Sequence, residues 1–259
     1  IGHMLRKWRV SKGLSQNVLG RAAGVSTRHI SFLETGRAQP SREMVLRLGE
    51  AMQIPLREQN PLLVAAGFAP VFSEHPLESP RAAPIDRAFR QFLDLPYPGV
   101  LVDRLWNIQA DNAIHRALRE ELTLEPPEEG PENVLRLWLS PTGLRRSVVN
   151  WSAAARSLWA RFDRQVSLAG TDRVLATLRD ELLLLPGVRG LTPPAKGKDR
   201  SALAIPLKFT CAGETLAWYC AVTRLAAPRD ITLQELRVEI LLPANPAAEA
   251  FCRAVRKDA

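Results

Sequence analysis

GLSQNVLGRAAGVSTRHISFLETGRAQP, residues 13 to 40, decides the fold of the first part of this chain. Ser15 and Ser26 are good N-caps, because each hydroxyl can accept a hydrogen bond from an amide that has no partner inside its helix. Gly24 lies where the first helix ends, since glycine adopts the left-handed backbone of a helix C-terminus at little cost. Gly36 ends the second helix in the same way. The stretch therefore predicts two short helices joined by a tight turn.

In helix-turn-helix proteins, the second helix of such a pair enters the major groove of DNA. A small αα-hairpin without a DNA-binding role is the alternative for this spacing, although caps, turn and apolar positions all agree here. The residue identities in GLSQ…LG..AGVS…I..LE.GR..P are more specific than the helical spacing alone. It resembles the xenobiotic-response-element (XRE) family of bacterial helix-turn-helix regulators over the first quarter of the chain. The resemblance implies a transcription regulator that binds double-stranded DNA.

Further helices are predicted on both sides of this stretch. One runs from about Gly2 to Lys12, a second starts after the cap Ser41, and a third begins at Pro55 and ends near Gly67. The sequence therefore predicts an all-α, five-helix helix-turn-helix domain over residues 1–72.

The basic residues are concentrated in this first part. The whole chain of 259 residues has a net charge of +8. Residues 1–72 hold ten Lys or Arg and four acids, which is +6, and the remainder is only +2. A basic module joined to a nearly neutral one indicates that the first part meets a polyphosphate and the second does not.

The exposed start of the second helix of the pair should supply the donors that read DNA. Arg28 can form a bidentate contact with guanine O6 and N7, although a phosphate contact or a solvated charge is the alternative. Thr27 and Phe32 could touch a thymine methyl group. Gln16 matches the position that binds a backbone phosphate in the XRE family. The predicted DNA-binding residues are Gln16, Ser26, Thr27, Arg28, Ser31, Phe32, Arg37 and Arg42.

Residues 73–84 are predicted to be a linker, because Pro76, Pro80 and Pro84 forbid a continuous helix. A second domain follows over residues 85–259. It starts with a helix from Ile85 to Leu93 and two short strands, Val100–Val102 and Trp106–Ala110, around a turn. Several helices come next, of which the longest are expected over about Ser152–Leu168 and Asp172–Leu184.

Three alternating segments then follow a basic loop from Pro193 to Arg200, and the first two are joined by a hairpin-like turn at Ala212–Glu214. A last helix is expected over about Pro246–Arg256. Two strands, helices and three strands predict an α+β domain with an antiparallel sheet whose helices lie mostly on one face. The alternating residues are Leu203, Ile205, Leu207 and Phe209; Leu216, Trp218, Cys220 and Val222; and Leu236, Val238, Ile240 and Leu242.

This order resembles a PAS domain, whose sheet cups a ligand cavity. More narrowly, several segments resemble the MmyB-like ligand-binding domain found behind XRE-type regulators, and the match extends over nearly the whole chain. Leu105 departs from the polar or aromatic residue usual there. The resemblance implies that the second domain binds a fatty acid or a similar lipid. The segments are 97–98, 102–107, 149–151, 185–188 and 230–237, with 55–70 matching the junction of the two domains.

We expect the ligand between the sheet and the helix that carries Leu158 and Phe162, in an apolar cavity with no charged motif. Large aromatic side chains are also common in cores, so some of the candidates could have only a packing role. The predicted ligand-binding residues are Trp106, Ile108, Trp151, Leu158, Phe162, Phe209 and Trp218.

The sequence carries no motif of an enzyme or of a metal site. It lacks HExxH, GxSxG, GxxxxGK[ST] and CxxC…H patterns. Neither His29 nor His115 has a partner placed by a motif, so we expect no catalytic residue, no metal and no cofactor other than a possible bound lipid. Three cysteines without a CxxC fit reduced thiols in the cytoplasm. No apolar run is long enough to span a membrane.

The sequence thus predicts a bacterial, cytoplasmic transcription regulator that binds operator DNA as a homodimer and senses a small apolar molecule. One alternative is a DNA-binding protein whose second domain serves only dimerisation or binding of a protein partner. Another is an enzyme with a DNA-binding appendage, which would need a polar convergent site in the second domain.

Overall fold

The structure, a computed structural model, describes residues 1–122, 131–169, 172–191 and 204–258. The predicted basic loop Pro193–Arg200 and Leu203 lie outside these ranges, as does most of the loop before residue 131. The chain forms two compact units. Unit 1 comprises Ile1–Pro76, residues around Leu168 and the segment Ala227–Gln234, and unit 2 comprises the rest.

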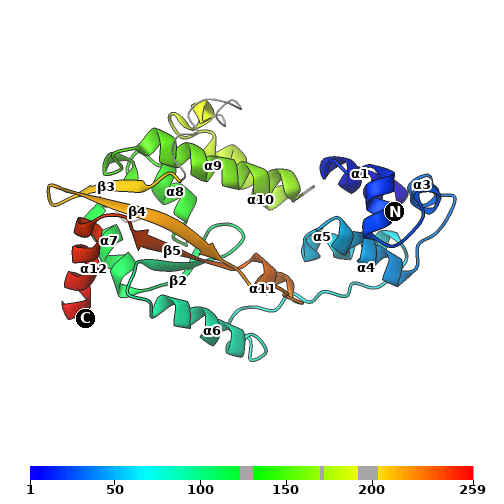
Figure 1. Cartoon of the computed structure of the whole chain (residues 1–259), viewed down its shortest axis with the longest axis horizontal. Helices are drawn as coiled ribbons and strands as arrows, with labels where there is room; N and C mark the ends of the chain where they lie inside the picture. The colour runs from blue at the N-terminus through cyan, green and yellow to red at the C-terminus, as the bar shows by residue number, and fades with distance from the viewer. Residues whose placement is uncertain (123–130, 170–171, 192–203, 259) are drawn as a thin grey trace. The chain divides into compact units, whose positions relative to one another are not determined.

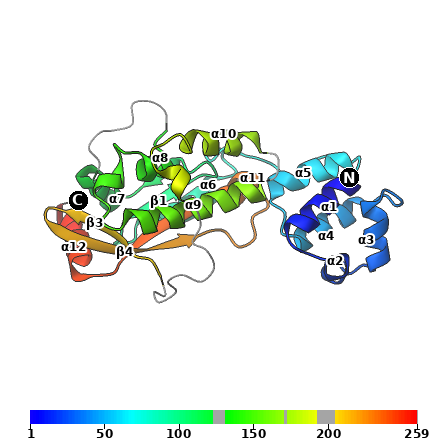
Figure 2. The same ribbon diagram turned by 90° about the horizontal axis from the view of Figure 1, so that it is seen from above.

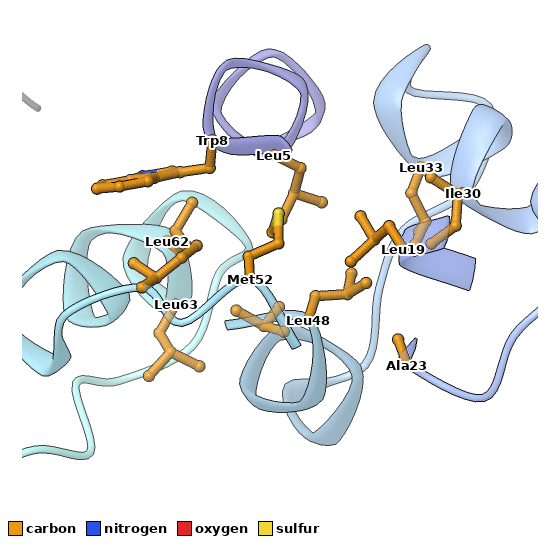
Figure 3. Close-up of a cluster of buried hydrophobic side chains, with 12 residues drawn as sticks. Leu5, Trp8, Leu19, Ala23, Ile30, Leu33, Leu48, Met52, Leu62 and Leu63 are labelled. Atoms are coloured by element: carbon orange, nitrogen blue, oxygen red, sulfur yellow. The ribbon is translucent and has the colours of Figure 1, made fainter. Parts of the chain in front are cut away.

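Unit 1 contains the predicted helices, and their order confirms the helix-turn-helix architecture (Figure 1). Apolar side chains from all five helices meet in its core, among them Leu5, Leu19, Leu33, Leu48 and Leu62 (Figure 3). Each such burial stabilises the fold by roughly 1.5–3 kcal/mol relative to an exposed side chain. The helices are α1 (Gly2–Ser11), α2 (Gln16–Ala22), α3 (Thr27–Glu34), α4 (Arg42–Ala51) and α5 (Leu56–Ala65).

Both predicted caps of the helix pair are present. The hydroxyls of Ser15 and Ser26 each accept a hydrogen bond, of 3.1 Å, from an amide of their own first turn. Gly24 has the left-handed φ of +66° that the turn requires. A Cβ at Gly20 would lie 2.7 Å from the backbone oxygen of Val25, so only glycine lets the two helices approach this closely.

The segment Ala227–Gln234 belongs to unit 1 through hydrogen bonds with the end of that unit. Helix α5 has no side-chain cap at Pro55, and the Oε1 atom of Gln234 accepts from the Leu56 amide at 2.7 Å. Nδ1 of His75 lies 2.7 Å from the carboxylate of Asp230. Unit 1 is therefore built from segments that are far apart in the sequence.

Unit 2 is an α+β unit, as predicted. Its helices are α6 (Ala83–Leu93), α7 (Ala113–Leu122), α8 (Val134–Leu139), α9 (Trp151–Leu168), α10 (Arg173–Leu182) and α12 (Pro246–Asp258), with the short 3-10 turns η1 (Leu144–Arg146) and η2 (Val188–Gly190). The short helix α11 (Ile231–Glu235) lies in the segment that belongs to unit 1, except for its last residue. Its strands are β1 (Gly99–Val102), β2 (Ile108–Asp111), β3 (Leu207–Cys211), β4 (Glu214–Thr223) and β5 (Arg237–Pro243).

The strands form one antiparallel five-stranded sheet in the order β2-β1-β5-β4-β3. The predicted hairpin between β3 and β4 is confirmed. Ala212 and Gly213 have φ values of +48° and +84°, which is the two-residue turn that matches the twist of paired strands.

The predicted strand Trp106–Ala110 starts too early. Trp106 lies in the turn before β2 with a left-handed φ of +68°, which is unusual for a bulky residue. The carboxylate of Asp103 holds this turn, because its Oδ1 atom accepts from the amides of Leu105 (2.8 Å) and Asn107 (2.9 Å). These bonds stabilise a backbone conformation that alternation alone does not predict.

Helices cover both faces of the sheet (Figures 1 and 2). Helix α6 covers one face near β1, where Leu93 lies against Gly99 and where Leu101 and Val238 are fully buried. Helix α9 runs along the opposite face. The pairing of Val100 with Glu239, and of Glu239 with Val222, places these three side chains on the α9 side.

Candidate DNA-binding surface and ligand cavity

Helix α3 presents its first residues to solvent. Thr27 and Arg28 are exposed, whereas Ile30 and Leu33 point into the core. The guanidinium carbon of Arg28 lies 5.2 Å from the centre of the Phe32 ring, one turn further along the helix. This stacking holds the Arg28 donors above the exposed side of α3.

The other predicted DNA-binding residues lie around α3 in different environments. Ser31 and Phe32 are half-buried, and Ser26 uses its hydroxyl as the helix cap. Arg37 and Arg42 are exposed before and at the start of α4. The part of the surface built from α3 and its flanks thus combines hydroxyl and guanidinium donors.

Gln16 is held within the unit. Its Nε2 atom donates to Glu34 at 2.9 Å, and Arg9 donates to the same carboxylate at 2.5 Å. Burial alone would raise the pKa of Glu34, but its bonds with Arg9 and Gln16 outweigh burial and keep that pKa below its ordinary value. Because Arg9 lies on α1, Gln16 on α2 and Glu34 on α3, these two hydrogen bonds hold the three helices together.

Unit 2 contains a cavity of about 600 Å³ between the sheet and helices α7, α8 and α9. This volume lies within the range of roughly 300–1,000 Å³ that small-molecule sites occupy. Most of the residues that line it are apolar. Lining residues include Leu118, Leu122, Val134, Trp138, Leu144, Leu158, Leu207, Phe209, Val222 and Leu241.

Of the predicted ligand-binding residues, Leu158 and Phe209 line this cavity, and the other five lie outside its wall. The ring of Phe162 is fully buried against Trp106 and Trp159. Trp218 is also fully buried and meets Phe251 edge to face. The indole of Trp151 donates to the backbone oxygen of Trp138, and Ile108 is half-buried in β2.

The expectation of a cavity without charged groups is wrong. His115, Arg119, Arg161 and Glu239 are among its lining residues. Arg161 forms an ion pair with Glu239, which also accepts from Nε of Arg237 at 2.9 Å. The sequence of β5 does not predict this charged cluster. Alternation indicates that Arg237 and Glu239, which lie between the apolar positions of β5, face solvent.

Trp106 supports the two arginines of this cluster. The guanidinium carbons of Arg161 and Arg237 lie 4.8 and 3.9 Å from the centre of its ring. The indole itself is fixed by a 2.8 Å hydrogen bond to Gln165 on α9. Trp106 therefore positions charged residues next to the cavity wall through cation–π contacts.

Burial and charge act in opposite directions on Glu239. Burial would raise its pKa, but Arg161 and Arg237 outweigh burial, so the pKa lies below its ordinary value. Glu239 is therefore ionised at neutral pH. Burial lowers the pKa of Arg237, and the Glu239 carboxylate partly opposes that shift.

A second polar group lies at the α7 wall of the cavity. Nδ1 of His115 lies 3.1 Å from the carboxylate of Asp111, which also accepts from Arg119 and Arg116. Burial would raise the pKa of Asp111, but its bonds with His115 and Arg116 lower it overall. Because Asp111 ends β2, these contacts fix α7 to the edge of the sheet.

The three cysteines carry free thiols. Burial raises the pKa of Cys211, that of Cys220 to about 12 and that of Cys252 to about 11. Among the described residues, no group of His, Cys, Asp or Glu could hold a metal ion. In the same part of the chain, no helix is both long and apolar enough to cross a membrane.

Comparison with known proteins agrees with both units. Residues 5–59 match the helix-turn-helix family model. Residues 85–255 match the model of the MmyB-like transcription regulator ligand binding domain, which covers well over half of the chain. No curated protein matches the sequence. The chain is thus a DNA-binding transcription regulator with a ligand-binding domain, and it belongs to the MmyB-like family.

Proposed function

We propose that this regulator binds operator DNA as a homodimer and that its MmyB-like domain senses an apolar small molecule, a fatty acid or a similar lipid. Ligand binding then shifts the population that is competent to bind DNA. In this proposal the protein is not an enzyme, and it acts in the bacterial cytoplasm, where its operator lies.

One observation carries the proposal: the cavity of about 600 Å³ whose wall is mostly apolar. A buried CH₂ group contributes about 0.8 kcal/mol, so a long acyl chain gains affinity from such a wall. The strand order and the curled sheet support the PAS-like interpretation, in which the sheet cups its ligand. The resemblance to MmyB-like domains favours a lipid.

Native mass spectrometry of the protein purified from bacterial cells tests the proposal. We expect a non-covalent adduct with the mass of a lipid, and a change in operator affinity when dodecanoate is added to delipidated protein. If the protein carries no lipid, and dodecanoate changes neither its thermal melting nor its operator binding, then sensing fails. The second unit would then serve dimerisation or a protein partner.

Two arginines of the helix-turn-helix unit should respond differently to substitution. Arg28→Ala should cost about 1–3 kcal/mol on the operator and relax specificity at one base pair, because in this proposal its exposed guanidinium reads a guanine. Arg42→Ala should weaken binding to all sequences about equally and lower the salt dependence, as loss of a phosphate contact does. Gel shifts on operator variants at several salt concentrations measure both effects. Uniform loss in both variants would contradict base reading by Arg28.

Dimerisation fits this mode of binding. Helix-turn-helix dimers place their two recognition helices on half-sites about one helical turn apart, so the operator mirrors the two-fold symmetry of the protein. We therefore propose an inverted repeat as the operator.

A further inference from the structure

The cavity wall carries more positive than negative charge at the end formed by β5 and α9. The carboxylate of Glu239 is paired with both Arg161 and Arg237. One carboxylate therefore serves two guanidinium groups. Arg224, directly after β4, adds a third nearby cation. Its side chain is still in contact with solvent, but partial burial, and then the charge of Arg161, lower its pKa.

The members of this cluster differ in their access to the cavity. Only 1 % of the Arg237 side chain and 9 % of that of Glu239 are exposed, whereas the Arg161 side chain keeps 36 %. Arg161 and Glu239 are lining residues, but Arg237 is not. Arg161 is thus the cation of this group that meets the cavity, and Arg237 neutralises Glu239 from behind.

The donors of Arg161 are only partly used by the protein. One Nη atom donates to Glu239, and the other lies 3.9 Å from Sγ of Cys220, which is a long contact to a weak acceptor. The ring of Trp106 holds the guanidinium in place from one side. The group is therefore fixed in position while it retains donors for a further acceptor.

The surroundings of Arg161 suit the end of a chain-like molecule. Leu158, one turn earlier on α9, lines the apolar part of the same cavity. Val100 and Val222 flank Glu239 on the neighbouring strands and also line the cavity. A polar end at Arg161 would therefore continue directly into apolar surroundings.

We infer that Arg161 binds the anionic head group of an amphiphilic ligand whose chain lies along the apolar wall. A carboxylate or a phosphate monoester has this chemistry, and either would balance the excess positive charge. Charge-assisted bonds from a guanidinium to such a group are about twice as strong as neutral ones. The inference rests on the proposed sensing function and adds to it the residue that binds the head group and the direction in which the chain lies.

Calorimetric titration of delipidated, full-length protein with dodecanoate, dodecyl phosphate and 1-dodecanol tests the inference. Arg161→Met keeps an unbranched, flexible side chain but removes its charge and its donors, and Glu239 stays paired with Arg237. We expect Arg161→Met to weaken binding of an anionic probe about 10- to 100-fold and to change dodecanol affinity by less than about threefold. The difference between dodecanoate and dodecyl phosphate in the wild type identifies which head group fits better.

Two further variants make the result specific. Arg164 lies on the same helix, but it is exposed and does not line the cavity. The Arg164→Met protein should therefore bind all three probes with the affinities of the wild type. Arg161→Lys keeps the charge and should retain part of the preference for anionic probes over dodecanol.

The outcomes separate this inference from the proposed function. If Arg161→Met weakens all three probes equally, or leaves the anionic ones unchanged, Arg161 does not bind the head group, although the apolar cavity still binds chains. If the wild-type protein binds none of the probes, the sensing proposal is wrong, and the inference about Arg161 is then wrong as well.

Discussion

Leu158→Trp is expected to close the cavity and expel the lipid. Leu158 lies on α9, is only 9 % exposed and lines the wall opposite the sheet. An indole in this place would occupy the volume of several methylene groups of a bound chain. Loss of about four CH₂ contacts corresponds to about 3 kcal/mol, or a roughly 200-fold lower affinity. Native mass spectrometry should then find no lipid on the purified variant, and operator binding should no longer respond to dodecanoate.

The matched control is Arg164→Trp, which adds the same indole to the exposed side of the same helix. It should keep its lipid and its response. Circular dichroism and operator binding without lipid show whether Leu158→Trp is folded. A folded Leu158→Trp protein that binds dodecanoate like the wild type would show that the chain does not lie between α9 and the sheet.

Of the proposed variants, Glu239→Gln should lower the free energy of unfolding the most. Its carboxylate is the shared partner of Arg161 and Arg237, and removal of one member of a buried ion pair typically costs about 3–5 kcal/mol. The glutamine would leave two guanidinium groups close together without a counter-charge. Urea denaturation at neutral pH, followed by circular dichroism, measures the change. The control is Glu249→Gln on α12, an exposed residue paired with Arg253, which should cost less than about 1 kcal/mol.

The cluster of Glu239, Arg161 and Arg237 should make the stability of the folded protein fall as the pH is lowered. The pKa of Glu239 lies below its ordinary value of 4.5 in the folded protein, so its contribution to stability is fully present above that value. The contribution is lost as the pH falls through the lowered, folded-state pKa. The stability difference between wild type and Glu239→Gln should therefore be large at pH 7 and shrink in acid. A difference that is small at pH 7, or constant with pH, would contradict the assigned role of Glu239.

The helix-turn-helix unit could be predicted from the sequence because its signals are local. Ser15 and Ser26 bond to amides three residues away, and the turn depends on single glycines. The sheet could be predicted for a similar reason, since its alternating segments and its hairpin turn also act over short distances.

The charged end of the cavity could not be predicted in this way. Alternation in β5 marks Val238 and Ile240 as inward and leaves Arg237 and Glu239 for the solvent side. That rule fails where helices cover both faces, as α6 and α9 do here. The partner that explains Glu239 is Arg161, 78 residues earlier in the chain. No local pattern joins them.

The position of Trp106 shows a second reason why the residues that line the cavity could not be predicted from the sequence. Aromatic residues on a predicted sheet look like candidates to line a pocket, but the left-handed turn at Trp106 moves its ring behind the wall. There it stacks on Arg161 and Arg237 rather than lining the cavity. Side-chain direction in a turn depends on φ at one residue, and composition does not reveal that angle.

The protonated state of the cysteines has a practical consequence for following this protein in solution. Only the thiolate reacts with alkylating reagents, and the raised pKa values of Cys211, Cys220 and Cys252 keep all three as thiols near pH 7. A cysteine introduced at an exposed site, such as Val174→Cys on α10, would be the fast-reacting position. A dye attached there would label the native chain at a single place without removal of its own cysteines.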